Sequence, residues 1–148
     1  MIVYLDASAL VKRYVRERGS KDVMELTATA RAAATAVISR AEVAAALARA
    51  VRLGVVGRVG GRRAQDNFSR EWPDFARIPV TEALVSLAER LAWDHDLRGY
   101  DAVQLAAAVT WQDVIGEDVV LATFDRQLWR AAPDVGLTAW PDKLVGSD

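Results

Sequence analysis

Strand-like apolar segments alternate with helical segments along the chain. The expected strands cover residues 2–5, 34–38, 75–80, 118–124 and 137–140. Strands separated by helices pair in parallel, and the helices then cover both faces of the sheet. We therefore expect an α/β fold in which residues 1–148 form a single domain around a central parallel sheet of about five strands.

The expected helices begin and end at residues that usually cap helices. Gly19 is expected to end the first helix, and Ser20 to cap the second, which runs to about residue 30. Ser39 is expected to start a helix that Gly54 closes. Further helices are expected over residues 55–72, where glycines interrupt the pattern, and over 81–96, 101–114 and 125–132. The tail from Gly146 is expected to be frayed.

The composition restricts the metal chemistry that the chain can support. The sequence has no cysteine and one histidine, His95, which excludes disulfides, thiolate metal sites and zinc sites built from several histidines. Oxygen ligands would have to hold any metal, which favours Mg²⁺, with Mn²⁺ as an alternative. His95 lies near an expected helix end, where a surface position or an interaction with the helix terminus is the usual role.

Charge and hydropathy limit the expected location and partners. No apolar run approaches the ~20 residues of a membrane span, and no signal segment precedes the first strand, so we expect a cytoplasmic protein without membrane contact. The net charge of −1 gives no overall attraction to nucleic acid. Local arginines are candidates for RNA contacts, with a merely solvated helix face as the alternative: Arg49, Arg52, Arg58, Arg62 and Arg63.

Four acidic residues occupy the same kind of position. Asp6 and Asp125 follow expected strands, whereas Glu42 and Asp101 lie at the beginnings of helices. In a parallel α/β sheet, the carboxyl ends of strands and the starts of the following helices share one edge, where ligands bind. Carboxylates gathered there would repel one another unless a cation were bound. The pattern therefore predicts a divalent metal site.

Helix capping is the alternative explanation for each acid. Ser39 and Glu42 have the spacing of a capping box, and Asp101 and Gln104 fit the same pattern. Asp6 and Asp125 are each placed to cap the helix that follows. For any one of these acids taken alone, capping is the more frequent role.

Four segments, in order, resemble the motifs of PIN domains. They are Ile-Val-Tyr-Leu-Asp6-Ala-Ser8, Ser39-Arg-Ala-Glu42, Leu97-Arg-Gly-Tyr-Asp101-Ala-Val-Gln-Leu-Ala106 and Leu121-Ala-Thr123-Phe-Asp125-Arg-Gln-Leu. The resemblance covers almost the whole chain, at the length typical of VapC-type toxins. It implies a PIN-like fold and a magnesium-dependent endoribonuclease that acts as the toxin of a toxin–antitoxin pair.

The resemblance also implies a role for each matched residue. Asp6 and Asp101 would be the principal metal ligands, Asp125 would complete the metal's coordination, and Glu42 would orient or deprotonate the attacking water. The hydroxyls that would hold waters or carboxylates in place are those of Ser8 and Thr123.

The same resemblance implies partners for the chain. A VapB-type antitoxin would lay a segment along the early helices and direct a basic side chain toward the acidic pocket, and the chain would form a homodimer. The candidate antitoxin contacts are Val11, Tyr14 and Val15, for which core packing is the alternative.

Three other functions compete with the toxin interpretation. The first is a PIN nuclease that works in RNA maturation or decay, outside toxin–antitoxin systems. The second, a receiver-like phospho-acceptor domain, lacks its adjacent acidic pair, and Lys143 follows the last expected strand. The third is a catalytically silent interaction module whose acids only cap helices.

Overall fold

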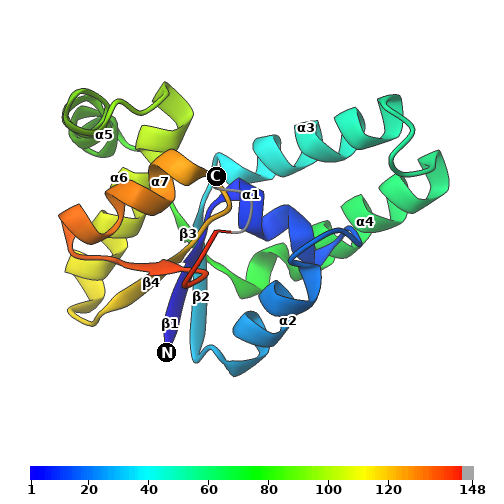
Figure 1. The fold of residues 1–148 in the computed structure, drawn as a ribbon, viewed down its shortest axis with the longest axis horizontal. Coiled ribbons are helices and arrows are strands. Elements are labelled where there is room, and N and C mark those ends of the chain that lie inside the picture. The colour runs from blue at the N-terminus through cyan, green and yellow to red at the C-terminus, as the bar shows by residue number, and fades with distance from the viewer. Residues whose placement is uncertain (145–148) are drawn as a thin grey trace.

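β1 (Ile2–Leu5) lies at the centre of a five-stranded, all-parallel sheet in the computed structural model, which describes residues 1–144 (Figure 1). The order is β3-β2-β1-β4-β5. The other strands are β2 (Ala32–Ala36), β3 (Ala76–Ile78), β4 (Val119–Ala122) and β5 (Thr138–Trp140). The predicted α/β class and its parallel sheet are confirmed. The prediction of a frayed tail from Gly146 lies outside the described residues.

Helices cover both faces of this sheet, as the sequence predicted. They are α1 (Ala7–Leu10), α2 (Ser20–Thr29), α3 (Ser39–Arg52), α4 (Arg58–Glu71), α5 (Glu82–His95), α6 (Gly99–Ile115) and α7 (Arg126–Ala131). Helices α1 to α4 lie on one side and α5 to α7 on the other (Figure 1). No helix within residues 1–144 is both long and apolar enough to cross a membrane.

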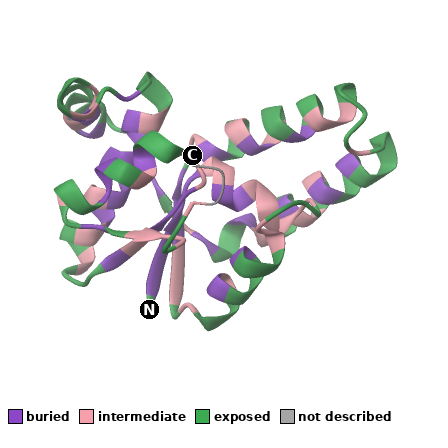
Figure 2. Cartoon of the chain, in the orientation of Figure 1, coloured by how far each residue is buried: buried purple, intermediate pink, exposed green. Residues whose placement is uncertain are grey.

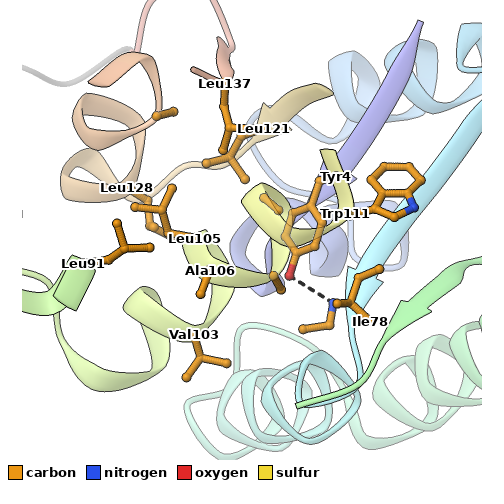
Figure 3. Packing of buried hydrophobic residues seen from close by; sticks show 14 of the residues in the cluster. Tyr4, Ile78, Leu91, Val103, Leu105, Ala106, Trp111, Leu121, Leu128 and Leu137 are labelled. Atoms are coloured by element: carbon orange, nitrogen blue, oxygen red, sulfur yellow. Dashed lines mark hydrogen bonds between the residues drawn. The ribbon is translucent and has the colours of Figure 1, made fainter. Parts of the chain in front are cut away.

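The side chains of β1 divide between two hydrophobic cores. Val3 and Leu5 pack with α1 to α4, whereas Ile2 and Tyr4 pack with α5 to α7. Figure 3 shows Tyr4 pointing into the second core, where its hydroxyl accepts the backbone N–H of Ala36 at 3.0 Å. All four β1 residues are buried because successive strand residues point to opposite faces and each face is covered (Figure 2).

Four strands differ in extent from the sequence prediction. β4 covers residues 119–122 of the predicted 118–124, and β5 covers residues 138–140 of the predicted 137–140. β2 begins and ends two residues earlier than residues 34–38 because Ala32 pairs with Ile2, while Ile38 already adopts helical geometry before α3. β3 covers only residues 76–78 of the predicted 75–80, and it lies at the sheet edge, where the proline that follows it, Pro79, is tolerated.

The prediction that the first helix continues to Gly19 is wrong. α1 ends at Leu10, and a single 3₁₀ turn, Val11–Arg13, replaces the remainder. The side chains that follow are drawn to α4, since Arg13 and Tyr14 both donate hydrogen bonds to Glu71, at 2.9 and 2.7 Å. These tertiary contacts outweigh the helical periodicity.

Gly19 and Ser20 also have other roles than predicted. Gly19 has φ 88° and precedes α2, so its left-handed backbone starts that helix rather than ending the one before it. Ser20 is the first residue of α2 and caps nothing. Its hydroxyl donates to the Val15 carbonyl at 2.6 Å and accepts from the Glu17 amide at 3.0 Å, which closes the loop before α2.

The order in which successive strands are added to the sheet reverses between β1 and β4, while all strands stay parallel. The chain moves outward from β1 through β2 to β3 and then returns to the other side of β1 for β4 and β5. Ligands bind at the carboxyl ends of strands beside such a switch point. The Asp6 amide donates to the Ala122 carbonyl at 3.2 Å, so the ends of β1 and β4 meet at this edge.

Candidate acidic site

Asp6 is the most deeply buried of the four predicted acids, with 3% of its surface exposed. Its Oδ1 accepts hydrogen bonds from the Ala9 amide at 2.9 Å and from Ser8 Oγ at 2.7 Å. Its Oδ2 accepts from Thr123 Oγ1 at 2.6 Å. Burial and, to a smaller extent, the charge of Asp125 raise the pKa of Asp6 to about 6, against the lowering effect of these hydrogen bonds.

Ser8 and Thr123 join the loop after β4 to the start of α1. The Ser8 hydroxyl, which donates to Asp6, also accepts the Phe124 amide at 2.8 Å. The Thr123 hydroxyl donates to Asp6 and accepts the Asp125 amide at 3.0 Å. The two hydroxyls therefore fix the Asp6 carboxylate and the backbone that carries Asp125 in one network.

Arg98 lies between Asp101 and Asp125. Its Nε donates to Asp101 Oδ2 at 3.0 Å and its Nη2 to Asp125 Oδ2 at 3.3 Å, although 76% of the arginine side chain is exposed. Partial burial raises the pKa of Asp101; Arg98 lowers it and Asp125 raises it. A cationic group therefore occupies the space where these two carboxylates approach each other.

Glu42 is held from the opposite side of the site by Gln104. Gln104 Nε2 donates to Glu42 Oε1 at 2.8 Å and to Ser39 Oγ at 2.9 Å, and its Oε1 accepts the Tyr4 hydroxyl at 2.6 Å. Partial burial raises the pKa of Glu42, the Gln104 hydrogen bond lowers it, and the charge of Asp101 raises it. The fully bonded glutamine thus sets where the Glu42 carboxylate lies.

The capping explanation is correct for two acids and wrong for the other two. Asp6 caps α1, and Asp125 caps α7 by accepting the Leu128 amide at 2.9 Å. Neither predicted capping box forms. Ser39, the predicted cap, is instead the first residue of α3, and Ile38 before it offers no side-chain cap. The buried Ser39 hydroxyl lies 2.7 Å from Thr35 Oγ1.

At the other predicted box, α6 begins at Gly99, two residues before Asp101. Asp101 therefore lies within the first turn and pairs with Arg98. Gln104, the far member of the box, points into the core instead. Capping accounts for neither Glu42 nor Asp101.

The four acids form a series of electrostatic neighbours at the carboxyl edge of the sheet. Asp6 and Asp125 influence one another, as do Asp125 and Asp101, and then Asp101 and Glu42. No three carboxylate or imidazole groups among residues 1–144 converge closely enough to hold one ion as they stand. The donor set nevertheless fits Mg²⁺ in kind, since it offers carboxylate oxygens whose mutual repulsion a divalent cation would relieve.

A cavity of about 690 Å³ opens beside two of these acids, between α5 and α6. Glu42, Arg98 and Asp101 line its charged end. Its walls are mostly apolar side chains and the exposed ring of Tyr100. The acidic site is therefore continuous with a groove that is wide enough for part of a larger molecule.

The other predicted contact residues lie away from the acids. Arg52, Arg58 and Arg62 line a groove between α3 and α4, and these helices extend away from the sheet (Figure 1). All five candidate RNA-contacting arginines are exposed. His95 ends α5, with Nδ1 3.9 Å from Asp134, so it lies at a helix terminus as predicted.

The candidate antitoxin contacts are half-buried rather than free. Val11, Tyr14 and Val15 pack against the core on the α1 to α4 side, where the Tyr14 and Phe68 rings lie 5.2 Å apart. Core packing, the alternative role, therefore accounts for much of the surface of these three side chains.

Sequence reasoning missed two residues that contact the acids. Arg98 directly precedes α6 and Gln104 lies within it, three residues before and three residues after Asp101. The i, i+3 spacing in the sequence could have indicated both residues. The contact between Gln104 and Tyr4 on β1 could not be predicted in this way, because the two residues are 100 positions apart and meet only in the folded chain.

Known proteins resemble this chain over nearly its full length. The family model of the PIN domain matches residues 3–133. "Ribonuclease VapC45" and "Ribonuclease VapC49", from the CDC 1551 and H37Rv strains of Mycobacterium tuberculosis, are each 34% identical over 143 residues, which is 97% of this chain and of each relative.

Solved structures show the same fold. VapBC2 from Rickettsia felis, bound to a promoter DNA fragment, aligns with a TM-score of 0.64 and 14% identity, covering 95% of this chain and 99% of that one. PAE2754 from Pyrobaculum aerophilum aligns with a TM-score of 0.65 and 22% identity, covering 94% and 89%.

Proposed function

The chain belongs to the PIN domain family, and from this membership we propose that it is a magnesium-dependent endoribonuclease, the toxin of a toxin–antitoxin pair. Its curated relatives are named as VapC ribonucleases, and a structural neighbour is a VapBC complex. The proposed substrate is RNA, and the proposed partner is a VapB-type antitoxin.

One observation carries the catalytic part of the proposal. Four carboxylates from distant parts of the chain are electrostatic neighbours beside the sheet's switch point. Such a cluster costs free energy through burial and mutual repulsion. Helix capping explains two of the acids and accounts for neither Glu42 nor Asp101. A divalent cation would relieve the repulsion among all four carboxylates.

The chain's residues divide the work of phosphodiester hydrolysis. Asp6, Asp101 and Asp125 would hold Mg²⁺, or Mn²⁺ in its place. When bound, the ion would offset the negative charge that develops on the phosphate and acidify a water. Ser8 and Thr123 keep the Asp6 carboxylate in one orientation. Glu42, held by Gln104, would orient the attacking water and accept its proton, and the raised pKa of Glu42 suits a proton acceptor.

The decisive experiment compares RNA cleavage by matched single variants of the full chain. Asp6→Asn and Asp101→Asn should each abolish cleavage in Mg²⁺, and EDTA should abolish cleavage by the unaltered protein. Asp113→Asn, an exposed position on the same helix as Asp101, should cleave normally. Cleavage retained by both site variants would contradict the proposal.

The same variants separate a catalytic role from a capping role. Asparagine keeps a side-chain oxygen that can accept the Ala9 amide, so Asp6→Asn preserves the cap of α1. If Asp6 served only the fold, this variant, once folded, would cleave RNA like the unaltered protein. Loss of cleavage by a fully folded Asp6→Asn protein would therefore exclude the silent-module alternative.

A further inference from the structure

The groove between α5 and α6 leads directly to the acidic site. Glu42 and Asp101 lie at one end of it, and its volume of about 690 Å³ falls within the range of small-molecule binding sites. The apolar lining comes from both helices: Val85, Ala88 and Ala92 on α5, and Tyr100 and Val103 on α6. A substrate held at the acids would thus have an apolar surface beside it.

The charge of the groove decides which part of a nucleic acid can enter. Its lining contains three acids, Glu42, Glu89 and Asp101, against one cation, Arg98. A second phosphate would meet net negative charge and apolar walls there. A flat, uncharged aromatic base would bury its faces against the same walls. The groove therefore favours a nucleobase over the sugar–phosphate backbone.

Tyr100 provides a surface on which a base can stack. It directly precedes Asp101, lines the groove, and has 64% of its surface exposed despite its aromatic ring. Bases stack on such rings in single-strand-binding proteins with little dependence on sequence. Asp101 and Tyr100 are consecutive residues, so a phosphate at the acid and a base on the ring can belong to one nucleotide or to neighbours.

We propose that the α5–α6 groove binds an unpaired nucleobase next to the scissile phosphate, with Tyr100 as its stacking surface. The inference rests on the proposed ribonuclease function and narrows its substrate to single-stranded RNA. A base in an A-form duplex is paired and stacked within the helix, and cannot enter a groove in the protein. Duplex RNA should therefore be a poor substrate.

The test uses full-length Asp6→Asn protein, which is expected to bind RNA without cleaving it and is altered outside the groove. Single-stranded RNA decamers, each with 2-aminopurine at one position, report base stacking through the loss of the probe's fluorescence. We expect quenching at one position, weak binding once the strand is annealed to its complement, and roughly tenfold weaker binding when Tyr100→Ala is added. Tyr100→Phe should restore both affinity and quenching.

Trp93→Ala is the matched control, since Trp93 is an aromatic residue of α5 with 84% exposure that is not part of the groove lining. It should leave binding unchanged. In the active protein, Tyr100→Ala should raise KM for single-stranded RNA with a smaller effect on kcat. Circular dichroism melts would verify that each variant is folded.

The outcomes separate this inference from the function on which it rests. An unaltered protein that neither binds nor cleaves RNA would overturn both. Cleavage by the unaltered protein together with unchanged KM and quenching in Tyr100→Ala would overturn the base-binding groove alone, as would equal cleavage of duplex RNA. A shift from dimer to monomer on gel filtration of Tyr100→Ala would show that a second copy of the chain covers the groove, and would also overturn the inference.

Discussion

Gln104 donates its side-chain amide to Glu42 at 2.8 Å, across 62 residues of sequence. The glutamine is 1% exposed, and its remaining bonds go to Tyr4 and Ser39. It therefore couples the packing of the core to the position of a carboxylate at the candidate site. Gln104 is a positioning residue, and its effect should be visible in both stability and pH dependence.

Replacing Gln104 with leucine should lower the free energy of unfolding and move the pH profile of cleavage. In this variant the buried hydroxyls of Tyr4 and Ser39 lose their hydrogen bonds to Gln104. Such a loss typically costs about 1–3 kcal/mol. It also removes the hydrogen bond that lowers the pKa of Glu42. Because the proposed role of Glu42 as proton acceptor requires its ionised form, the acid limb of kcat against pH should shift to higher pH.

Gln112→Leu is the control for Gln104, because Gln112 lies on the same helix and bonds only backbone groups, at Val119 and Gly136. It should destabilise the protein without moving the acid limb. An unshifted limb in Gln104→Leu would show that the glutamine supports the fold alone.

Asp6→Asn should become more stable relative to the unaltered protein as the pH rises. The pKa of Asp6 is about 6 in the fold, against an ordinary value of 3.8, so the folded state retains a proton that the unfolded state has lost. The contribution of Asp6 to stability is therefore greatest below about pH 4 and is lost as the pH rises through about 6. The shift corresponds to about 3 kcal/mol, an order-of-magnitude figure.

Asparagine does not titrate, so residue 6 causes no such loss of stability in Asp6→Asn as the pH rises. Urea denaturation at pH 4 and pH 7, in EDTA, measures how the difference between the two proteins changes. Asp113→Asn, on the exposed surface of α6, should show no such change. A difference that stays constant with pH would contradict the assignment of a buried, repelled carboxylate.

Removing the guanidinium of Arg98 should tighten Mg²⁺ binding several-fold. Arg98 neutralises Asp101 and Asp125 together, so an incoming cation has to compete with it for the same oxygens. In Arg98→Ala the two carboxylates repel each other more strongly, which favours the ion. Isothermal titration with Mg²⁺ and with Mn²⁺ measures the change.

Arg98→Lys keeps a positive charge near the acids and should bind Mg²⁺ about as tightly as the unaltered protein does. Weaker metal binding in Arg98→Ala would instead mean that the arginine prepares the site for the ion. Thermal melts with and without Mg²⁺ provide an independent measure, since a ligand that binds only the folded state raises the melting temperature.

The sheet and the positions of the acids were predictable because they depend on local patterns. Short apolar runs such as residues 2–5 and 118–124 mark buried strands, and parallel pairing brings Asp6 and Asp125 to one edge. Two of the failures involve contacts between distant segments. Glu71 draws Tyr14 away from a helical path, and Tyr4 draws Gln104 into the core. No periodicity within either segment reveals such a partner.

The capping boxes failed for the same reason. A serine followed three residues later by glutamate has the local chemistry of a cap, but the buried Ser39 hydroxyl instead accepts the side-chain amide of Gln104, 65 residues away. Local capping and tertiary hydrogen bonding compete for the same hydroxyl, and burial decides between them. The sequence pattern therefore identified Glu42 while assigning it the wrong neighbours.

The arginines of the α3–α4 groove test whether RNA extends beyond the acidic site. Arg52, Arg58 and Arg62 line this groove of about 600 Å³ on helices that project from the sheet. Replacing Arg58 and Arg62 together with alanine should weaken RNA binding and make the logarithm of affinity depend less steeply on the logarithm of salt concentration. The slope should change by about 1.4, which corresponds to two lost contacts with single-stranded phosphate.

The kcat for bound RNA should stay unchanged in that double variant, because these arginines do not line the cavity at the acids. Arg77→Ala, an exposed arginine on β3, is the control and should leave the salt dependence as it was. If the double variant and the control behave alike, the α3–α4 face is only solvated, and RNA recognition depends on the edge of the sheet where the four acids lie.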